Sequence, residues 1–483
     1  MASSTSQFEQ YNTKEIQQKD KDHFMHPWQI FDLFREDGAL PIARGEGCYI
    51  WDTDGNKYFD AVGGLWCNNI GLGRKDMAEA IARQAYQLSY ASPFTDLTNA
   101  PAALLCHKLA ELAPGNLNHV MLSCGGSTAI DSAYRLIHFY QNCRGKRDKK
   151  QIISRINSYH GSTFIAMSIG GKPGDRSSLF DYEDKAIHHI SCPDYYHGAE
   201  DGMSEADYLE MLLKEFEDKI IELGGEDKVS AYFAEPVMGA GGVIVPPEGY
   251  NKRMWEICQK YDILYVSDEV VTAFGRLGHW FASKDVFDVQ PDIIPSAKGL
   301  TSGYLPLGAT IFSDDIFDVI NEKDQGRCFT QGYTYSGHPV ACAAALKNIE
   351  ILEQENIFDN VNEVGPYFRQ QLETLLDLPI VGQVRGSKFM MCVEFVADKE
   401  SKALFDESLD IGKHIANHAD VKGLIVRPLV HLNVMSPPLI MTKEDVDFVV
   451  ATLRECILET MQDLHREGHY EDQFTDYLLR KEA

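Results

Sequence analysis

The sequence ILYVSDEV at residues 263–270 is a short apolar run that ends in two carboxylates. Such a run is typical of a strand buried in a parallel sheet. Similar runs recur along the chain, with helix-period segments between them: His119–Leu122, Gln151–Ser154, Val229–Ala234, Ile293–Ala297 and Gly308–Phe312. Short apolar strands that alternate with helices predict an α/β fold, with a mostly parallel central sheet and helices on both of its faces.

The chain on either side of this region has a mixed pattern. Strand signals occur at Cys48–Trp51 and Lys57–Phe59, before the alternating region. After it come a long helix at about 340–354 and strands near 382–393, 423–427 and 432–436. We therefore expect a large domain over residues 76–335 and a smaller α+β domain built from both chain ends, residues 1–75 and 336–483.

The composition argues against several classes of protein. The 483 residues include 72 Asp and Glu against 45 Lys and Arg, so the net charge is −27. This charge argues against a nucleic-acid partner or an acidic membrane surface, because both are polyanions. The first segment is polar and no run of about 18 apolar residues occurs, so we expect neither a secretion signal nor a membrane span. Eleven scattered cysteines without a CxxC pair are typical of a reduced, cytoplasmic protein.

One cluster of residues looks superficially like a metal site. It contains His188, His189, Cys192 and His197. Its spacing fits no standard zinc pattern, and the Pro-Asp pair after Cys192 indicates a turn. We therefore expect no metal site.

The segment from Ser123 to Thr128 follows one predicted strand and opens a predicted helix. Gly126 and Ser127 lie where the backbone N–H groups at the helix start are free to bind an anion such as phosphate. An ordinary helix cap is the alternative interpretation. The spacing is neither that of a P-loop nor GxGxxG, so ATP and NAD are not supported.

Two charged residues stand at the ends of two other predicted strands. Asp268 follows the run at 263–267, and Lys298 follows the run at 293–297. Ligands bind at the carboxyl ends of the strands in such sheets. Each residue alone could be structural, Asp268 as a turn cap and Lys298 as a surface cation. Beside a phosphate cradle, the two suit a lysine that forms a Schiff base with an aldehyde cofactor.

Further motifs carry a resemblance to a known family. They are GGLW at 63–66, YHGST at 159–163, EPVMG at 235–239, DEVVT at 268–272, KGL at 298–300, GYTYSGHP at 332–339 and GLIVRP at 423–428. With these motifs the chain resembles the class III aminotransferases, which have fold type I and use pyridoxal 5′-phosphate (PLP). Within that class it is most similar to the enzymes that use amines or ω-amino acids with pyruvate. The resemblance runs from about Trp28 to Leu464.

The resemblance implies a role for each residue around the cofactor ring. Lys298 is implied to form the Schiff base and then to carry a proton. Asp268 is implied to pair with the pyridine nitrogen, which makes the ring a better electron sink. Val270 and Tyr159 are implied to pack against the two faces of the ring.

The resemblance also implies that the phosphate contacts come from two subunits. Gly126 and Ser127 match the family's phosphate-binding turn, and Thr334 matches the threonine that reaches in from the other subunit. The implied assembly is a homodimer, or a tetramer built from dimers, with shared active sites. The chain departs from the family pattern at several positions, and those near the turn leave the phosphate contacts open: Cys124, Gly125, Thr128, Ala273, Gln331 and Lys388.

The implied substrate pocket has aromatic walls and one arginine. Trp66, Phe94 and Tyr159 are implied to form walls that suit an apolar or extended amine. Arg427 is implied to bind the carboxylate of the keto-acid acceptor, since a guanidinium fits a carboxylate bidentately. Glu235 has two interpretations: it pairs with Arg427 when no carboxylate is bound, or it forms hydrogen bonds behind the pocket.

The implied reaction is a transamination in two halves. A primary amine at a terminal carbon, or an ω-amino acid, gives its nitrogen to PLP, and a keto acid, chiefly pyruvate, takes it and leaves as alanine. An aminomutase or epimerase of the same family is the alternative. A non-catalytic protein on the same fold is a third hypothesis, which Lys298, Asp268 and Thr334 disfavour. The sequence does not identify the amine.

Overall fold

The computed structural model describes residues 11–94 and 96–470. Its central sheet has seven strands in the order β4-β10-β9-β8-β7-β5-β6. Neighbouring strands from β9 to β6 are parallel, whereas β10 runs antiparallel to β9 and β4. The predicted α/β class with a mostly parallel sheet is confirmed. The strands are β4 (His119–Ser123), β5 (Gln151–Arg155), β6 (Ile187–Ile190), β7 (Val229–Ala234), β8 (Leu264–Ser267), β9 (Ile293–Ser296) and β10 (Gly308–Phe312).

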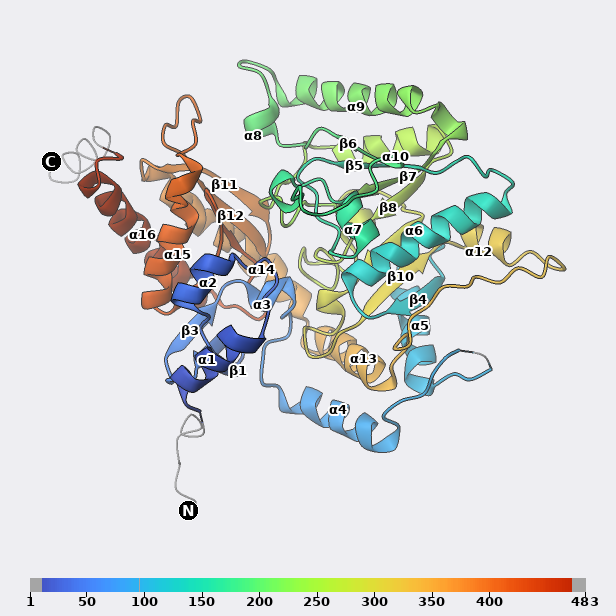
Figure 1. Ribbon diagram of the computed structural model, residues 1–483, viewed down its shortest axis with the longest axis horizontal. Helices are drawn as coiled ribbons and strands as arrows, with labels where there is room; N and C mark the ends of the chain where they lie inside the picture. The colour runs from blue at the N-terminus through green and yellow to red at the C-terminus, as the bar shows by residue number, and fades with distance from the viewer. Residues whose placement is uncertain (1–10, 95, 471–483) are drawn as a thin grey trace.

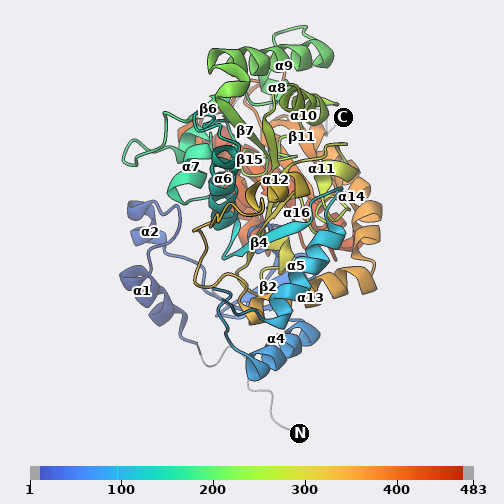
Figure 2. The same ribbon diagram turned by 90° about the vertical axis from the view of Figure 1, so that its right-hand side faces the viewer.

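Helices cover both faces of this sheet. Phe233 of β7 packs in the cluster that contains α6 (Gly126–Cys143) and α7 (Phe164–Ile169). Its neighbour Tyr232 packs on the other face, with α9 (Glu205–Glu222) and α10 (Tyr250–Lys260). Figure 2 shows α9 and α10 together, apart from α6 and α7. Strands buried on both faces explain why these runs are almost wholly apolar.

Early and late segments of the described chain meet beside the central sheet (Figure 1). One small sheet has the order β1-β2-β3-β13, so the late strand β13 pairs with the early strand β3. The other has the order β11-β12-β15-β14. The strands are β1 (Ile42–Glu46), β2 (Tyr49–Asp52), β3 (Lys57–Asp60), β11 (Val381–Ser387), β12 (Met390–Phe395), β13 (Leu424–Ile425), β14 (Arg427–Leu429) and β15 (Leu432–Met435). The domain limits at residues 75 and 335 stay a prediction.

Four long helices of the later half of the chain pack against the small sheets or against earlier helices. They are α13 (Pro339–Gln354), α14 (Ile357–Glu373), α15 (Ile411–Val421) and α16 (Lys443–Arg466). The remaining helices are α1 (Thr13–His23), α2 (Phe31–Asp37), α3 (Gly63–Trp66), α4 (Lys75–Gln87), α5 (Ala100–Leu112), α8 (Tyr195–Gly198), α11 (Ala282–Asp285) and α12 (Asp314–Ile320). Within the described residues, no helix has the length and apolar character needed to cross a membrane.

Two predicted strands of the later half are each divided in the structure. The segment near 382–393 is a hairpin, and Lys388 in its turn has φ 53°. The segment near 423–427 contains two strands of different sheets, β13 and β14, with Val426 between them. This break places Arg427 at the junction of the two small sheets.

Candidate active site

Parallel pairing brings the polar residues at the strand ends together. Ala234 of β7 pairs with Ser267 of β8, so Glu235 and Asp268 leave the sheet side by side. Lys298 follows β9, the neighbour of β8. A cavity of about 560 Å³ opens at this edge of the sheet. All but two of the predicted site residues line it: Trp66, Gly126, Ser127, Tyr159, Glu235, Asp268, Val270, Lys298 and Arg427.

Asp268 is held by two donors at the bottom of this cavity. Its Oδ1 accepts the backbone N–H of Val270 at 3.1 Å, and its Oδ2 lies 2.6 Å from Nδ1 of His160. The other ring nitrogen of His160 lies 3.2 Å from the hydroxyl of Ser154. The His160 side chain is fully buried. The sequence motif YHGST contains His160 but predicts no role for it. Only the structure, in which β5, β7 and β8 lie next to one another in that order, shows that His160 reaches Asp268.

Glu235 forms hydrogen bonds behind the pocket. Its Oε1 accepts the N–H of Tyr159 at 3.0 Å, and its Oε2 accepts the N–H of Gly239 at 2.8 Å. Within the described residues it has no ion pair with Arg427; these contacts favour the second of its two interpretations, which stays a prediction. Burial raises the pKa of Glu235, and the two N–H donors oppose that shift.

Lys298 carries its amine into the cavity from a tight turn. Its φ is 41°, in the left-handed region, where the chain turns from β9 into a short 3₁₀ helix. Burial lowers the pKa of its amine, although Cys67, Asp268 and Glu235 oppose the shift. A lowered pKa increases the neutral fraction of the amine, the form that can attack a carbonyl and accept a proton.

The turn before α6 is ordered by Thr128, one of the departures from the family pattern. The Thr128 hydroxyl donates to the carbonyl of Gly125 at 2.8 Å and accepts the N–H of Cys124 at 3.1 Å. No side chain caps the first turn of α6. The Ser127 hydroxyl accepts the N–H of Ser162 at 3.0 Å. The hydroxyl of Thr128 thus shapes the turn and leaves the helix amides open to an anion.

Arg427 has no ion pair within the part of the chain that the structure describes. Its Nε is buried without a hydrogen-bond partner. Burial lowers the pKa of the guanidinium, and the nearby Tyr159 and Asp175 oppose the shift. An arginine that lines a cavity with unsatisfied donors is suited to a carboxylate ligand.

Two predicted site residues, Phe94 and Thr334, do not line this cavity of the single chain, and their roles stay predictions. Phe94 is 51% exposed and lies against Gly332, in the segment that also carries Thr334. Thr334 is exposed, and its carbonyl accepts the hydroxyl of Tyr90 at 2.7 Å. The chain beside Thr334 contacts the first turn of α6, where the Tyr333 hydroxyl donates to the carbonyl of Thr128 at 3.0 Å.

The four residues of the metal-like cluster all have other partners. His188 and His189 lie on β6, a strand that the sequence analysis did not predict, and their Nε2 atoms contact Gln151 and the carbonyl of Ile169. His197 contacts Glu394, and Cys192 lies 3.8 Å from the sulfur of Met238. Among the described residues, no group of three or more His, Cys, Asp or Glu side chains is arranged so that it could hold a metal ion.

Residues 35–457 match the family model described as aminotransferase class III. The chain belongs to the class III aminotransferases. It is 39% identical over 456 residues to putrescine–pyruvate aminotransferase of Pseudomonas aeruginosa, which covers 94% of this chain and 98% of that relative. An (S)-enantioselective omega-transaminase from Thermomicrobium roseum has a TM-score of 0.90 and 36% identity, over 93% of this chain and 99% of its own. The omega transaminase from Pseudomonas jessenii in complex with PMP has a TM-score of 0.90 and 35% identity, over 92% and 98%.

The cofactor of this family is PLP, and the cavity fits it. A Cβ on Gly126 would lie 3.0 Å from a methyl group of Val270, so only glycine leaves this surface open. Gly161 has φ 134°, and a Cβ there would meet the Ser127 hydroxyl at 2.5 Å. The free start of α6, the carboxylate of Asp268 and the amine of Lys298 supply the donors and acceptors that phosphate, pyridine nitrogen and aldehyde need.

Proposed function

We propose that this aminotransferase moves the amino group of a terminal primary amine, or of an ω-amino acid, to pyruvate, giving a carbonyl compound and alanine. One observation carries the proposal: Lys298, Asp268 and an unpaired Arg427 line a single cavity. The relative from Pseudomonas aeruginosa, named for putrescine and pyruvate, supports the choice of substrates.

Each residue has a task in this reaction. PLP, when bound, supplies the electron sink that allows the nitrogen to leave one carbon and join another. Asp268 holds a proton at the pyridine nitrogen, and His160 keeps that carboxylate in place. Lys298 accepts a proton from the substrate carbon and returns it. Arg427 binds the carboxylate of pyruvate, and the aromatic walls at Trp66 and Tyr159 exclude water.

The test is a measurement of product balance. The purified protein with PLP is given 1,4-diaminobutane and pyruvate, and both alanine and remaining amine are quantified. We expect one alanine for each amine consumed, and none with Lys298→Ala. No alanine from any terminal amine would contradict the proposal. Isomerisation of an amino acid without loss of pyruvate would point instead to the aminomutase or epimerase alternative.

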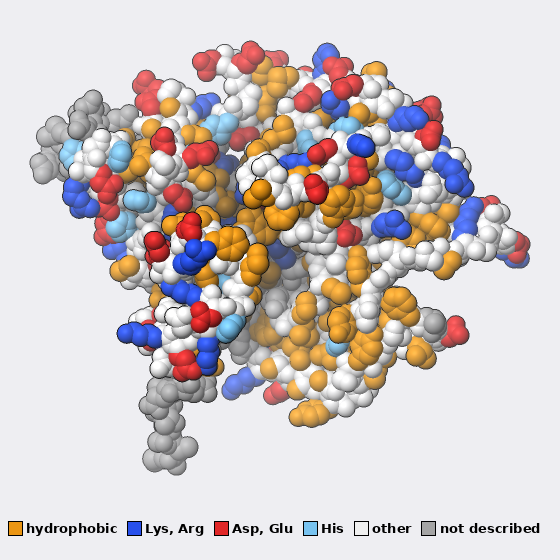
Figure 3. Space-filling model, viewed as in Figure 1, with side chains coloured by type: hydrophobic (Ala, Val, Ile, Leu, Met, Phe, Trp, Pro, Cys, Tyr) orange, Lys and Arg blue, Asp and Glu red, His pale blue; other side chains and the backbone are white. Residues whose placement is uncertain are grey.

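We also propose that the site is completed in a homodimer, or in a tetramer of such dimers. The surface that carries Phe94 and Thr334 is rich in exposed apolar side chains: Tyr86, Leu88, Tyr90, Leu97, Leu104 and Tyr335. Figure 3 shows hydrophobic side chains gathered over α4, α5 and the chain before α13. Such a patch is unusual on a monomer.

The shared site can be tested by complementation. Lys298→Ala and Thr334→Ala chains are co-expressed with different tags, and the mixed dimer is purified. If the partner subunit's Thr334 completes each site, the mixed dimer has one intact site and about half of the wild-type activity. Activity no greater than that of the Thr334→Ala homodimer would contradict the shared site.

A cytoplasmic location is the last part of the proposal. All eleven cysteines are unpaired in the structure. Free thiols, several of them partly exposed, suit a reducing compartment.

A further inference from the structure

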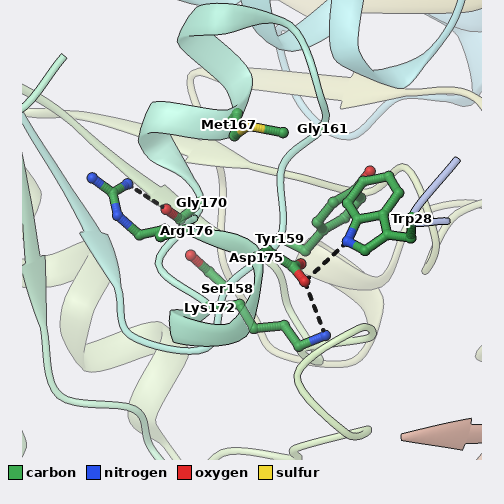
Figure 4. Close-up of a pocket in the computed structure, with 9 residues that line it drawn as sticks. All are labelled: Trp28, Ser158, Tyr159, Gly161, Met167, Gly170, Lys172, Asp175 and Arg176. Atoms are coloured by element: carbon green, nitrogen blue, oxygen red, sulfur yellow. Dashed lines mark hydrogen bonds and ion pairs between the residues drawn. The ribbon is translucent and has the colours of Figure 1, made fainter. Parts of the chain in front are cut away.

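A carboxylate lies at the wall of the cavity where the proposed reaction does not require one. Asp175 ends a short 3₁₀ helix, Pro173–Asp175, and lines the same cavity as Lys298 and Arg427. Its side chain is only 14% exposed. Figure 4 shows Trp28 and Lys172 both pointing toward it, with Tyr159 beside them.

The two neighbours of Asp175 occupy one of its oxygens. The indole N–H of Trp28 donates to Oδ1 at 3.1 Å, and Nζ of Lys172 lies 3.4 Å from the same atom. Oδ2 has no hydrogen-bond donor within the described part of the chain. The contact to Lys172 is longer than the roughly 2.7–2.9 Å of a strong charge-assisted hydrogen bond. The Oδ2 atom of Asp175 is therefore open to a hydrogen bond from a ligand ammonium.

The charge of Asp175 is unfavourable for the anionic ligands of this site. Pyruvate and the cofactor phosphate are both anions, and a partly buried carboxylate beside their cavity repels them and loses hydration. Lys172 and the nearby Arg427 offset part of this cost, and a ligand that brings a positive charge to this wall offsets more of it. A terminal diamine is such a ligand, because one amine reacts at Lys298 and the other keeps its proton.

The surroundings of Asp175 also suit the carbon chain between two amines. The rings of Trp28 and Tyr159 lie 5.9 Å apart in an edge-to-face arrangement at this wall. Apolar ring surfaces leading to a carboxylate match methylene groups that end in an ammonium.

We propose that Asp175 binds the distal ammonium of a diamine donor and so selects diamines over monoamines and ω-amino acids. The inference rests on the proposed transamination and names its preferred class of donor. Arg427 and Asp175 then divide the ligands between them: the guanidinium takes the carboxylate of the acceptor, and the carboxylate takes the second charge of the donor.

The test compares three donors of similar length with pyruvate as acceptor: 1,4-diaminobutane, 1-aminopentane and 4-aminobutanoate. For Asp175→Asn, we expect the ratio of kcat/KM for the diamine to that for the monoamine to fall about tenfold, the usual scale for one charge-assisted hydrogen bond. The ratio of kcat/KM for 4-aminobutanoate to that for the monoamine should rise, because the substitution removes a negative charge that repels the carboxylate of this donor. Lys172→Met should raise the ratio of kcat/KM for the diamine to that for the monoamine, since it removes a cation that competes for Asp175.

The matched control is Asp181→Asn, an exposed carboxylate in the same segment that does not line the cavity. It should leave both ratios unchanged. Equal changes for all three donors in Asp175→Asn would overturn the proposal, because they would show a purely structural role. A changed KM for pyruvate with unchanged donor ratios would also overturn it, since Asp175 would then act through Arg427.

Binding without turnover gives a second readout. In the Lys298→Ala background with PLP bound, calorimetry should show that 1,4-diaminobutane loses about tenfold in affinity when Asp175→Asn is added, and 1-aminopentane much less. Equal losses would overturn the proposal. If the wild type makes no alanine from any of the three donors, the proposed transamination has failed; if it does and the ratios do not move, only the role of Asp175 has failed.

Discussion

Three buried carboxylates follow β7 and β8, two of them at the cavity, and their hydrogen bonds give them different tasks. Glu235 and Glu269 each accept two backbone N–H groups, which makes them structural supports for the loops after β7 and β8. Asp268 accepts one N–H and one imidazole nitrogen. Glu269 also accepts the hydroxyl of Thr272 at 2.9 Å, whereas the side-chain partner of Asp268 is the imidazole of His160.

The contact between His160 and Asp268 leads to the first prediction. We expect His160→Gln to lower kcat/KM by about tenfold, because losing one charge-assisted hydrogen bond costs about 1.4 kcal/mol. The absorbance of bound PLP, followed against pH, should shift as well, since Asp268 is less firmly held beside the ring nitrogen. Ser154→Ala, which removes the other partner of His160, is the milder control. An unaltered pH titration of the spectrum would contradict this role.

The unpaired guanidinium of Arg427 leads to the second prediction. We expect Arg427→Ala to lower kcat/KM for pyruvate by about 100-fold, because a bidentate charge-assisted pair is worth about 2–3 kcal/mol. A carboxyl-free aldehyde used as acceptor should lose far less. The kcat/KM values for both acceptors are measured in the second half-reaction, which starts from enzyme that already carries the amino group of a donor. Equal losses for the two acceptors would count against a role in binding the carboxylate.

At the scale of elements, the positions where strands are interrupted explain more about the site than the strands themselves do. The interruption at Val426 moves the chain from one small sheet to the other and sets Arg427 at the cavity. The turn at Lys388 closes the β11–β12 hairpin with a positive φ. Apolar periodicity marks both segments as strands, but it does not reveal such breaks, because a single residue in another conformation hardly alters the pattern.

The backbone at Lys388 leads to the third prediction. Its φ of 53° lies in the left-handed region, which costs a residue with a Cβ roughly 1–2 kcal/mol. We expect Lys388→Gly to raise the free energy of unfolding by about 0.5–1 kcal/mol, after the entropy lost by glycine on folding is subtracted. Chemical denaturation measures the change. Lys388→Ala is the control that keeps the Cβ; if it stabilises the protein as much as glycine does, backbone strain is not the cause.

At the scale of the whole molecule, a buried ionic network joins the later half of the chain to the large sheet region. Glu394 of β12 contacts both Arg385 of β11 and His197 of α8. Arg385 also donates to the carbonyl of Gly242 at 2.7 Å. The hydrogen bond that His197 donates to the Glu394 carboxylate raises the pKa of His197. Burial raises the pKa of Glu394, but its bonds to His197 and Arg385 outweigh that effect and lower it.

This network leads to the fourth prediction. A raised pKa in the folded state means that His197 stabilises the fold fully below its ordinary pKa of 6.5 and loses this effect as the pH rises through the raised value. For Glu394 the effect is present above its ordinary pKa of 4.5. We expect His197→Gln to destabilise the protein most between about pH 4.5 and 6.5. Denaturation curves at pH 6 and pH 9 check this, and a loss of stability that is the same at both would contradict it.

The charge of −27 also belongs to this scale. It argued against polyanionic partners, although the proposed ligands are themselves small anions. The cavity lining is less acidic than the chain as a whole, because Lys172, Lys298 and Arg427 balance its carboxylates at Asp175, Glu235 and Asp268, and the start of α6 adds free N–H groups. The acidic excess describes the surface, and it is compatible with a cationic donor.

The sequence by itself determined the α/β class and predicted nine of the residues that line the cavity, and its resemblance to a known family implied the cofactor. Strand ends that are far apart along the chain can be predicted to lie close together, because a parallel sheet collects its carboxyl ends at one edge. Only the tertiary structure decided which contacts those residues make. His160 supports Asp268, Glu235 supports two backbone N–H groups, Phe94 lies outside the cavity and Asp175 lies at its wall. These contacts join residues many positions apart, through side-chain directions that depend on how the loops fold over the sheet, and a local pattern of residue types holds no information about them.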